Sequence, residues 1–492
     1  MVRKALHVAE KPSVAKELAA ILSNNTHQAR RGCSQFNQLF EFNGTLENQP
    51  CAMVVTSVLG HLMEMEFDEQ HRKWNSCPHG ALFDAPLYTN VRQPSGDTNY
   101  EDVRRNLEQA CRGCTDLVLW LDCDREGEAI GFEVLGVCTK INRNLRCRRA
   151  RFSALIPRDI HHALANLVNP DNHQSEAVLA RTEIDLRLGA AFTRMQTTAL
   201  QNKFDGLGDS GPLSYGPCQF PTMWFVAQRA DRIAAFVPEE FWRIEMRHSG
   251  TTEDGEQLEV SFSWSRHRLF DRLATLVLYE MCVQRGTASI TSVSARPATR
   301  RRPTPLATVE LQRDASSKLH ISSDQTMEIA EKLYQRGYLS YPRTETDGFQ
   351  SGFDLHSLIQ SQAQDARWGG FAQKLLAGDF QWPRAGGKDD HAHPPIHPVK
   401  AADNSLDARE ARLYELIARR FLACCSKDAL GHETTIKAEM AGEEFTASGL
   451  MVIERNYLGE RAAQSPPTTA AHSPKTSDAQ RAERAPQAEI AL

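Results

Sequence analysis

The chain has 492 residues, of which 41% are hydrophobic and 24% charged, and it carries a formal net charge of −5. This length is too great for one compact core, so several packed units are expected. No apolar run approaches the roughly 18 residues that a membrane helix needs, which favours a soluble protein without membrane contact. The negative net charge does not by itself indicate a nucleic-acid-binding protein, so any site for a polyanion has to be local.

The twelve cysteines follow no regular framework, and a chain of this size does not need disulfides. They are therefore interpreted as reduced thiols of an intracellular protein. Cys111 and Cys114 have the spacing of zinc ligands, but no second pair stands at a usable distance, so two thiols at a helix end are favoured. The N-terminal residues contain too short an apolar stretch for a secretory signal, and no other targeting signal stands out.

The first third of the chain alternates strands with helices. Residues 6–9 predict a short apolar strand, and a helix begins at Pro12, with apolar residues repeating at helical spacing. Residues 51–57 and 115–124 predict two more buried strands, the second followed by another helix. This alternation predicts a parallel α/β unit over residues 1–150.

The rest of the chain alternates between helical and strand patterns. Residues 151–215 are predicted to be mainly helical, and residues 240–300 alternate like strands. Helical patterns return over residues 305–425, and strand patterns reappear after them. The polar, aperiodic, Pro- and Ala-rich C-terminal stretch is expected to be disordered.

An acidic cluster follows the strand at 115–124. Asp122, Asp124 and Glu126 converge on one face if the extended backbone continues through them. Like charges held together resist ionisation unless a cation neutralises them, and Mg²⁺ suits such carboxylates. The alternative is a solvated turn with acids at a helix start, which the two aspartates alone would favour. Glu10 and Lys11 stand at the equivalent end of another strand, and their presence favours a metal site over a solvated turn.

A second cluster follows a predicted helix. Ser322 and Gln325 read as its capping box, and Gly337 reads as its stop. The residue before a proline is pushed out of the helical region. Tyr341, which precedes Pro342, is therefore expected to be extended just beyond this helix.

Tyr341 and Arg343 then project to the same side of the chain, two residues apart. A phenol beside a permanent guanidinium is a reasonable pair for attacking a phosphate, because Arg holds phosphate oxygens in charge-assisted bonds. Tyr338 follows the glycine stop directly and is interpreted as packing. A lone Tyr-Pro-Arg would more often be structural, so this pair needs support from the rest of the chain.

Three histidines lie in "GGKDDHAHPPIHP": His391, His393 and His397. Zinc is conceivable, but the prolines prevent a helix that would stack them, so contact with phosphate is preferred. Two basic clusters, residues 143–151 and 296–303, are interpreted as solvated loop surface. No phosphate-binding loop of the G-x-x-x-x-G-K-[ST] type occurs, so an ATPase of that class is not supported.

Eight ordered blocks, from about residue 5 to about residue 458, resemble eukaryotic-type DNA topoisomerase III, a type IA topoisomerase. The blocks are "AEKPSVAK", "SVLGHLMEM", "LDCDREGEAIGFEV", "RTEIDLRLGAAFTRMQT", "YGPCQFPT", "LYQRGYLSYPRTETD", "AHPPIHP" and "FLACCSKDA". Eight blocks in family order are far more specific than any single motif.

The resemblance implies a role for each candidate residue. Tyr341 attacks a phosphodiester of single-stranded DNA and becomes a 5′-phosphotyrosine, which Arg343 stabilises. Glu10 shuttles a proton to the leaving 3′ oxygen, and Lys11 adds positive charge at the phosphate. Mg²⁺ is held by Asp122, Asp124 and Glu126, with Glu10 beside them. His393 is a phosphate contact near the tyrosine. The single-strand groove is lined by Arg181, Asp185, Gln219 and Thr222.

The family fold implies a multidomain α/β plus α+β protein. A Toprim domain with a Rossmann-like parallel sheet, helical domains and a strand-rich arch form a toroid, and the tyrosine domain lifts as a gate. The expected boundaries are 1–150 for the Toprim metal-binding domain, 151–238 for the helical DNA-groove domain, 239–303 for the outgoing arch, 304–427 for the tyrosine domain, 428–458 for the returning arch and 459–492 for a disordered tail.

The sequence departs from the family pattern after residue 458. The rest of the returning arch, a further helical segment and any C-terminal zinc modules are expected to be missing, which leaves the toroid incomplete and arch strands unpaired. Three hypotheses follow. The first is an ATP-independent topoisomerase that relaxes negative supercoils and resolves recombination and replication intermediates. The others are a non-catalytic single-strand-binding form and a Toprim-type nuclease or primase-like enzyme.

The resemblance also implies partners and a location. Single-stranded and negatively supercoiled DNA are the expected substrates, and no ATP is needed because a phosphodiester is exchanged for a phosphotyrosine. A RecQ-type helicase and an OB-fold protein are the expected protein partners. The expected location is the nucleus.

Overall fold

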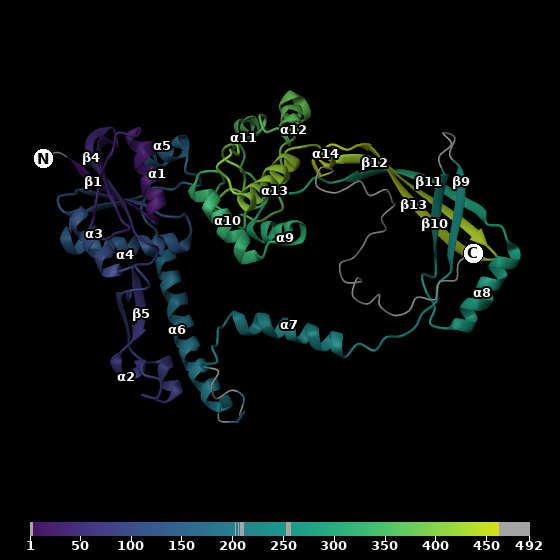
Figure 1. The fold of residues 1–492 in the computed structure, drawn as a ribbon, viewed down its shortest axis with the longest axis horizontal. Helices are drawn as coiled ribbons and strands as arrows, with labels where there is room; N and C mark the ends of the chain where they lie inside the picture. Colours follow the sequence, from purple (N-terminus) through teal and green to yellow (C-terminus); the bar gives the residue numbers. More distant parts are fainter. Residues whose placement is uncertain (1–2, 202, 205, 207–210, 252–256, 462–492) are drawn as a thin grey trace. The chain divides into compact units, whose positions relative to one another are not determined.

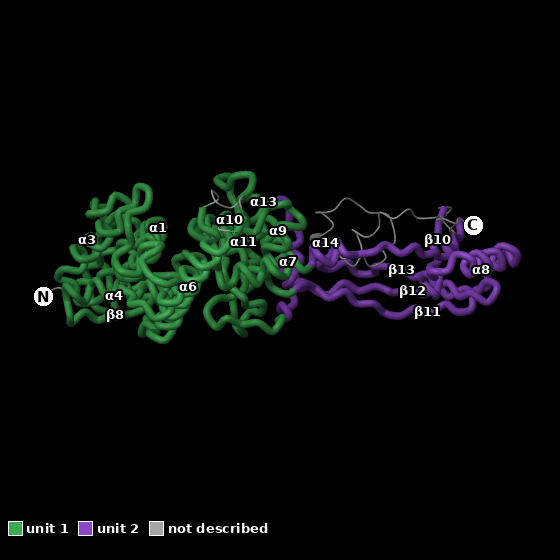
Figure 2. Tube along the Cα trace, turned by 90° about the horizontal axis from the view of Figure 1, so that it is seen from below, with its two compact units in different colours: residues 1–228, 304–365, 385–421 green, residues 229–303, 366–384, 422–492 purple. Residues whose placement is uncertain are grey.

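The computed structural model describes residues 3–201, 203–204, 206, 211–251 and 257–461. The chain divides into two compact units, shown in two colours in Figure 2. The first unit is Met1–Gln228, Thr304–Asp365 and Ala385–Phe421, and the second is Arg229–Pro303, Ala366–Arg384 and Leu422–Leu492. Most of the tail expected to be disordered, from residue 462 onward, lies outside the described residues.

A six-stranded sheet in the first unit has the order β2-β3-β4-β1-β7-β8. Its strands are β1 (Lys4–Ala9), β2 (Gln28–Arg30), β3 (Leu39–Leu46), β4 (Gln49–Ser57), β7 (Asp116–Trp120) and β8 (Arg146–Arg149). β1 is parallel to β4 and β7, and β7 is parallel to β8, whereas β2 and β3 are antiparallel additions at one edge. The three strands predicted from the sequence therefore form the centre of the sheet, as expected for a parallel α/β unit.

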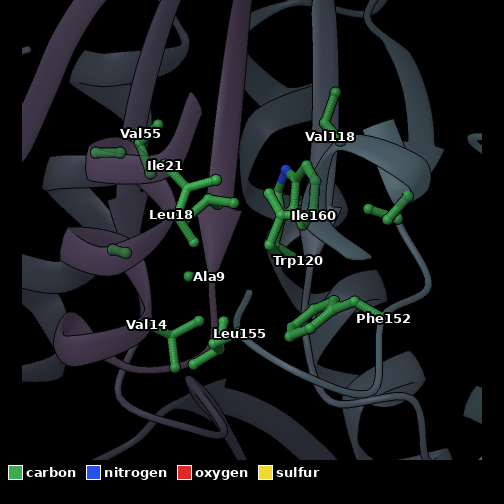
Figure 3. Packing of buried hydrophobic residues seen from close by; sticks show 14 of the residues in the cluster. Ala9, Val14, Leu18, Ile21, Val55, Val118, Trp120, Phe152, Leu155 and Ile160 are labelled. Carbon is green, nitrogen blue, oxygen red and sulfur yellow. The ribbon is translucent and has the colours of Figure 1, made fainter. Parts of the chain in front are cut away.

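Helices cover both faces of this sheet (Figure 1). α1 (Pro12–Ser23) and α5 (Pro157–Ala165) contribute to one buried cluster, and α3 (Tyr100–Cys111) and α4 (Arg125–Ile141) contribute to the other. Successive strand residues point to opposite faces. In β7, Val118 and Trp120 pack in the first cluster and Leu117 and Leu119 in the second. Figure 3 shows the first cluster, with Trp120 near Phe152 and Ile160.

The remaining elements of the first unit are mainly helical. They are the hairpin β5 (Met63–Phe67) and β6 (Leu87–Val91), the short helices α2 (Glu69–Arg72) and η1 (His79–Phe83), α6 (Asn172–Gln201), α7 (Gln219–Ala234), α9 (Thr308–Leu319), α10 (Ser323–Gln335), α11 (Leu355–Gln362) and α13 (Ala408–Cys424), the last parts of α7 and α13 lying in the second unit. In the described part of the chain, no helix combines the length and the apolar character that crossing a bilayer requires.

The second unit is built on an antiparallel sheet with the order β11-β12-β13-β10-β9. Its elements are β9 (Glu245–Thr251), β10 (Gln257–Trp264), α8 (Arg272–Arg285), β11 (Ser289–Arg300), α12 (Gly369–Lys374), η2 (Leu375–Asp379), β12 (Ala429–Met440), β13 (Glu443–Glu454) and α14 (Leu458–Arg461). The strand character expected around residues 240–300 and after residue 430 is confirmed. Helix α8 was not predicted, although Asp271 caps it and Gly286, with a φ of 66°, ends it.

One sequence interpretation is wrong in this unit. The basic residues from 296 to 300 belong to strand β11, where Arg296 pairs with Glu433 of β12 at 2.6 Å, so they are not loop surface. β13 pairs with β12 along its length but with β10 only at Phe445 and Thr446. Within the described residues, its second half therefore has a strand on one side only.

Candidate active site

The candidate site lies in the first unit, at the carboxyl ends of β1 and β7. Ala9 and Trp120 are paired neighbours at the ends of these strands, so the residues that follow them emerge at one edge of the sheet. The backbone N–H of Asp122 donates a hydrogen bond of 3.2 Å to Oε2 of Glu10. Lys11 Nζ lies 3.8 Å from the other oxygen of Glu10. The structure thus brings the two predicted strand ends together.

Asp122 is the most enclosed carboxylate at this edge, with 7% of its surface exposed. Burial raises the pKa of its carboxyl to about 7, and repulsion from Glu10 adds to the rise. The buried hydroxyl of Tyr334 donates to Oδ1 of Asp122 at 3.1 Å. Ionisation of Asp122 beside Glu10 is therefore unfavourable unless a cation compensates the two negative charges.

Asp124 does not continue strand β7. The three carboxylates were expected to converge only if the extended strand continued through them, and it does not. Asp124 is the N-cap of α4, where its Oδ1 accepts the N–H of Gly127 at 2.8 Å. The helix therefore begins before Glu126 and turns that side chain away from the direction a strand would give it. Oδ2 of Asp124 is left free for another donor, and the hydroxyl of Tyr341 donates to it at 2.6 Å.

Tyr341 is held in place by its backbone and by its ring. Gly337, with a φ of 69°, ends the preceding helix, whose first turn is capped by the Ser322 side chain as predicted. The N–H of Tyr341 then donates to the carbonyl of Ser153 at 3.1 Å. Its side chain is 4% exposed. Burial, followed by repulsion from Asp122 and Asp124, raises the pKa of the phenol well above its usual range, so it is protonated at neutral pH.

His393 stacks against this phenol. The two ring centroids are 4.2 Å apart, and His393 is 5% exposed. Neither ring nitrogen has a hydrogen-bond partner within the described residues. Burial lowers the pKa of the imidazole to about 4, so it is neutral. A buried donor and acceptor without partners are unfavourable, so both nitrogens are available to a ligand.

The three histidines of the "AHPPIHP" region do not converge. His391 pairs with Asp389 on the surface, and the Nδ1–H of His397 donates to the carbonyl of Pro395 in the interior. Across the described ranges, no group of three His, Cys, Asp or Glu side chains stands close enough to hold a metal ion.

Arg343 is held by a residue that sequence reasoning missed. Its Nε lies 2.8 Å from Oε1 of Glu331, and its Nη2 lies 2.5 Å from the same oxygen. Glu331 stands on α10, the helix that precedes the tyrosine segment, and nothing in the spacing of charges singled it out. The guanidinium therefore has a partner before any phosphate arrives.

Glu126 lies in a second polar cluster beside Asp124. Its Oε1 is 2.6 Å from Nη2 of Arg181 on α6, and its Oε2 is 3.0 Å from Nε2 of His61. Nδ1 of His61 lies 2.7 Å from Glu133. Glu133 first, and then Glu126, raise the pKa of His61 to about 9. His61 belongs to the quoted block "SVLGHLMEM", which is the signal that could have identified it.

The other predicted groove residues make no such contact. Asp185 is exposed one turn beyond Arg181 on α6, and Gln219 and Thr222 are exposed in the first turn of α7. The Thr222 hydroxyl donates to the carbonyl of Cys218 at 2.8 Å. Only Arg181 of this set is brought to the carboxylates, so the groove assignment of the other three stays a prediction.

Arg149, in the basic cluster predicted to be loop surface, is almost completely buried. Its Nε lies 2.9 Å from Oε1 of Glu128, and its Nη2 donates to the carbonyl of Asp122 at 2.6 Å. The surface interpretation is therefore wrong for Arg149, because its buried guanidinium donates a hydrogen bond to the backbone just past the end of β7. Arg149 fixes the backbone from which the Asp122 carboxylate projects.

The side chains present fit a hard divalent cation. Mg²⁺ is served by one or two carboxylates together with water molecules. Asp122 and Asp124 face the tyrosines at this edge, with Glu10 against the Asp122 backbone. Burial first, and then repulsion from Glu10, raises the pKa of Asp122, and a bound cation would offset both effects. Glu126 is the exception, because its two oxygens face the cationic side chains of Arg181 and His61, which already compensate its charge.

Comparison with known proteins agrees with this geometry. A family model described as DNA topoisomerase matches residues 169–485, and a Toprim domain model matches residues 5–155. The chain belongs to the DNA topoisomerase family, and its resemblance to topoisomerase III of type IA, inferred from the sequence blocks, is confirmed.

Relatives and one solved structure show the extent of the likeness. The chain is 47% identical to DNA topoisomerase 3-alpha of Arabidopsis thaliana (92% of this chain, 49% of that protein) and 48% identical to the Homo sapiens protein of the same name (93% and 45%). It therefore spans about half the length of these relatives. Full-length topoisomerase I from Thermotoga maritima matches with a TM-score of 0.66 at 20% identity over 96% of this chain and 69% of that chain, which confirms the expected fold class.

Proposed function

We propose that the chain carries the breakage and rejoining centre of a type IA DNA topoisomerase, acting on single-stranded and negatively supercoiled DNA without ATP. The observation that carries the proposal is the place of Tyr341. Its hydroxyl lies 2.6 Å from Asp124, at an edge that also holds Asp122 and Glu10, and its ring is stacked on His393. A packing tyrosine would not need such neighbours.

The reaction exchanges one phosphoester for another. The Tyr341 oxygen attacks the phosphorus, the bond to the 3′ oxygen breaks, and the 5′ phosphate becomes attached to the tyrosine. The phenol proton leaves toward Asp124, which already accepts it in a hydrogen bond. Glu10 is placed to return a proton to the departing 3′ oxygen. Reversal of these transfers rejoins the strand, so no nucleotide is consumed.

Cationic and neutral side chains stabilise the phosphate. Arg343 and Lys11 supply fixed positive charge near the reacting group. His393 offers its two unpartnered ring nitrogens as phosphate contacts. Asp122, Asp124 and Glu10, with Glu126 when it is released, would hold Mg²⁺. When bound, Mg²⁺ supplies charge compensation that positions the DNA backbone at this edge.

Plasmid relaxation and adduct formation test this proposal. With Mg²⁺, the chain should relax negatively supercoiled plasmid and form a covalent adduct at a 5′ DNA end. Tyr341→Phe should abolish the adduct, whereas Tyr338→Phe should retain it, because the Tyr338 hydroxyl bonds to Asp403 away from the site. Binding without cleavage would favour a single-strand-binding form. Cleavage that survives Tyr341→Phe would favour a Toprim nuclease.

The partners and location follow from the same likeness. Similarity to topoisomerase 3-alpha proteins supports action in the nucleus with a RecQ-type helicase and an OB-fold protein on recombination and replication intermediates. Co-purification of the tagged chain from nuclear extract tests these assignments. Absence of both kinds of partner from the purified material would contradict the partner assignment.

A further inference from the structure

We propose that Glu126 couples cation binding to nucleic-acid binding, because one carboxylate serves as counter-ion of Arg181 and as ligand for the divalent cation. A cation that recruits Glu126 frees Arg181 for a DNA phosphate, and a phosphate on Arg181 frees Glu126 for the cation. This inference rests on the proposed function, since it assigns Arg181 to DNA and Glu126 to the cation.

Both oxygens of Glu126 are committed in the ligand-free chain. Oε1 forms an ion pair with Nη2 of Arg181 at 2.6 Å, and Oε2 lies 3.0 Å from Nε2 of His61. Arg181 is 62% exposed and Glu126 is 38% exposed at the side chain. The pair is therefore open to solvent and can exchange partners without unfolding its surroundings.

The other side of the cluster is fixed. His61 is anchored by Glu133, whose Oε1 lies 2.7 Å from Nδ1 of the imidazole. The second oxygen of Glu133 accepts the backbone N–H groups of Leu62 and Met63, at 2.7 and 3.1 Å. Glu133 is 13% exposed, and all of its acceptors face this one loop. Glu126 is thus positioned by a rigid partner, His61, and by an exposed partner, Arg181, which is the one that can leave.

The choice between partners creates a linkage. Glu126 cannot fully neutralise both Arg181 and a cation at the same time. Binding of the cation or of DNA therefore requires Glu126 and Arg181 to separate, and whichever binds first lowers the free-energy cost of that separation for the other. Whatever factor the cation adds to DNA affinity, DNA adds to cation affinity. A structural ion pair without this role would weaken DNA binding, or leave it unchanged, when it is removed.

Equilibrium binding in chelator separates these cases. The 492-residue chain with Tyr341→Phe, which cannot form the adduct, is titrated with a fluorescent single-stranded oligonucleotide at fixed ionic strength. Adding Glu126→Gln should tighten binding about two- to five-fold, the range expected for releasing one exposed ion pair. The gain should vanish when Arg181→Ala is also present, because no guanidinium remains to be freed.

Glu183→Gln is the matched control. Glu183 is an acid on α6, two positions from Arg181, with 45% of its side chain exposed, and it pairs with Arg187 at 2.8 Å. This change removes the same charge from the same helix without freeing Arg181, so it should tighten binding less than Glu126→Gln does. In a second titration with Mg²⁺ at the same ionic strength, the chain with intact Glu126 should gain affinity for the oligonucleotide, and the Glu126→Gln chain should gain less.

Three outcomes would overturn the coupling. They are an equal gain from Glu183→Gln, a gain that persists with Arg181→Ala, and an Mg²⁺ effect that is the same with and without Glu126. Each of them leaves the proposed function standing, because oligonucleotide binding and adduct formation are measured independently. Failure of every variant to bind the oligonucleotide would overturn both proposals.

Discussion

The hydroxyl of Tyr341 donates a hydrogen bond of 2.6 Å to Oδ2 of Asp124, although 217 positions separate the two residues along the chain. The other oxygen of Asp124, Oδ1, accepts the backbone N–H of Gly127 in the cap of α4, and Oδ2 remains available for the Tyr341 hydroxyl. The contact joins the tyrosine segment to the acidic edge of the parallel sheet. Burial of the ring, and then repulsion from Asp122 and Asp124, raises the pKa of the phenol and keeps it protonated.

Loss of Glu331 should slow formation of the covalent adduct. Glu331 holds the guanidinium of Arg343 at 2.8 Å, so Glu331→Ala releases a long side chain that must then be ordered on the phosphate. We expect single-turnover cleavage of an oligonucleotide to fall by about ten-fold, in line with loss of a positioning contact. Glu328→Ala is the control, since Glu328 pairs with Lys332 one turn earlier on α10. Equal rates for the two variants would show that Glu331 does not position Arg343.

Arg149→Met should destabilise the parallel sheet unit. The substitution leaves Glu128, 4% exposed, as an unpaired buried charge and removes the donor to the Asp122 carbonyl. Breaking a buried pair in this way costs about 3–5 kcal/mol. Thermal unfolding should show the loss, and adding Glu128→Gln should restore part of it. Arg148→Met, at a side chain that donates to Asn169 in an exposed contact, should change the transition little.

His397 should make stability fall in mild acid. Burial lowers the pKa of this imidazole to about 4, against an ordinary value near 6.5. Between these values the unfolded chain binds a proton that the folded chain does not, so stability is lost as pH falls from about 6.5 to about 4. The difference corresponds to about 3 kcal/mol at most.

Urea midpoints at pH 7 and pH 5 measure this effect. His397→Gln should reduce the difference between the two midpoints, whatever it does to stability at pH 7. His391→Gln, at a residue whose side chain is 86% exposed, should leave the difference unchanged. A pH dependence that His397→Gln does not alter would show that this residue is not the group responsible.

Part of the fold was predictable because the signals were local. Strands β1, β4 and β7 carry continuous apolar residues, and the cap at Ser322 and the stop at Gly337 mark the ends of α10. The carboxyl ends of parallel strands meet at one edge of a sheet, so the sequence alone predicts that Glu10 lies near Asp122.

The rest of the site depends on tertiary contacts that leave no local pattern. The ion pair between Arg343 and Glu331 joins two elements around a glycine stop, and the approach of Arg181 to Glu126 depends on the course of α6. The convergence of Asp122, Asp124 and Glu126 was expected only if the strand continued through them, and this condition is not met because Asp124 caps a helix there. The residues around Asp124 could either extend the strand or cap a helix, and no local pattern in the sequence distinguishes these two backbone conformations.

The open half of β13 should promote self-association. Leu450, Met451 and Ile453 are all more than half exposed on a stretch that has a strand on one side only within the described residues. Exposed apolar edge strands are templates for pairing with other chains. Met451→Lys should therefore lower the aggregated fraction in light scattering at a fixed protein concentration. Val237→Lys, at an exposed apolar residue outside any strand, should lower it less.

Mass-spectrometric mapping of the covalent adduct is the most direct test of the account. The chain is incubated with a single-stranded oligonucleotide and Mg²⁺, denatured and digested with protease and nuclease. The account predicts a peptide that carries a 5′-linked nucleotide on Tyr341. A nucleotide on Tyr334 or Tyr338, or cleaved DNA with no nucleotide on any peptide, would contradict it.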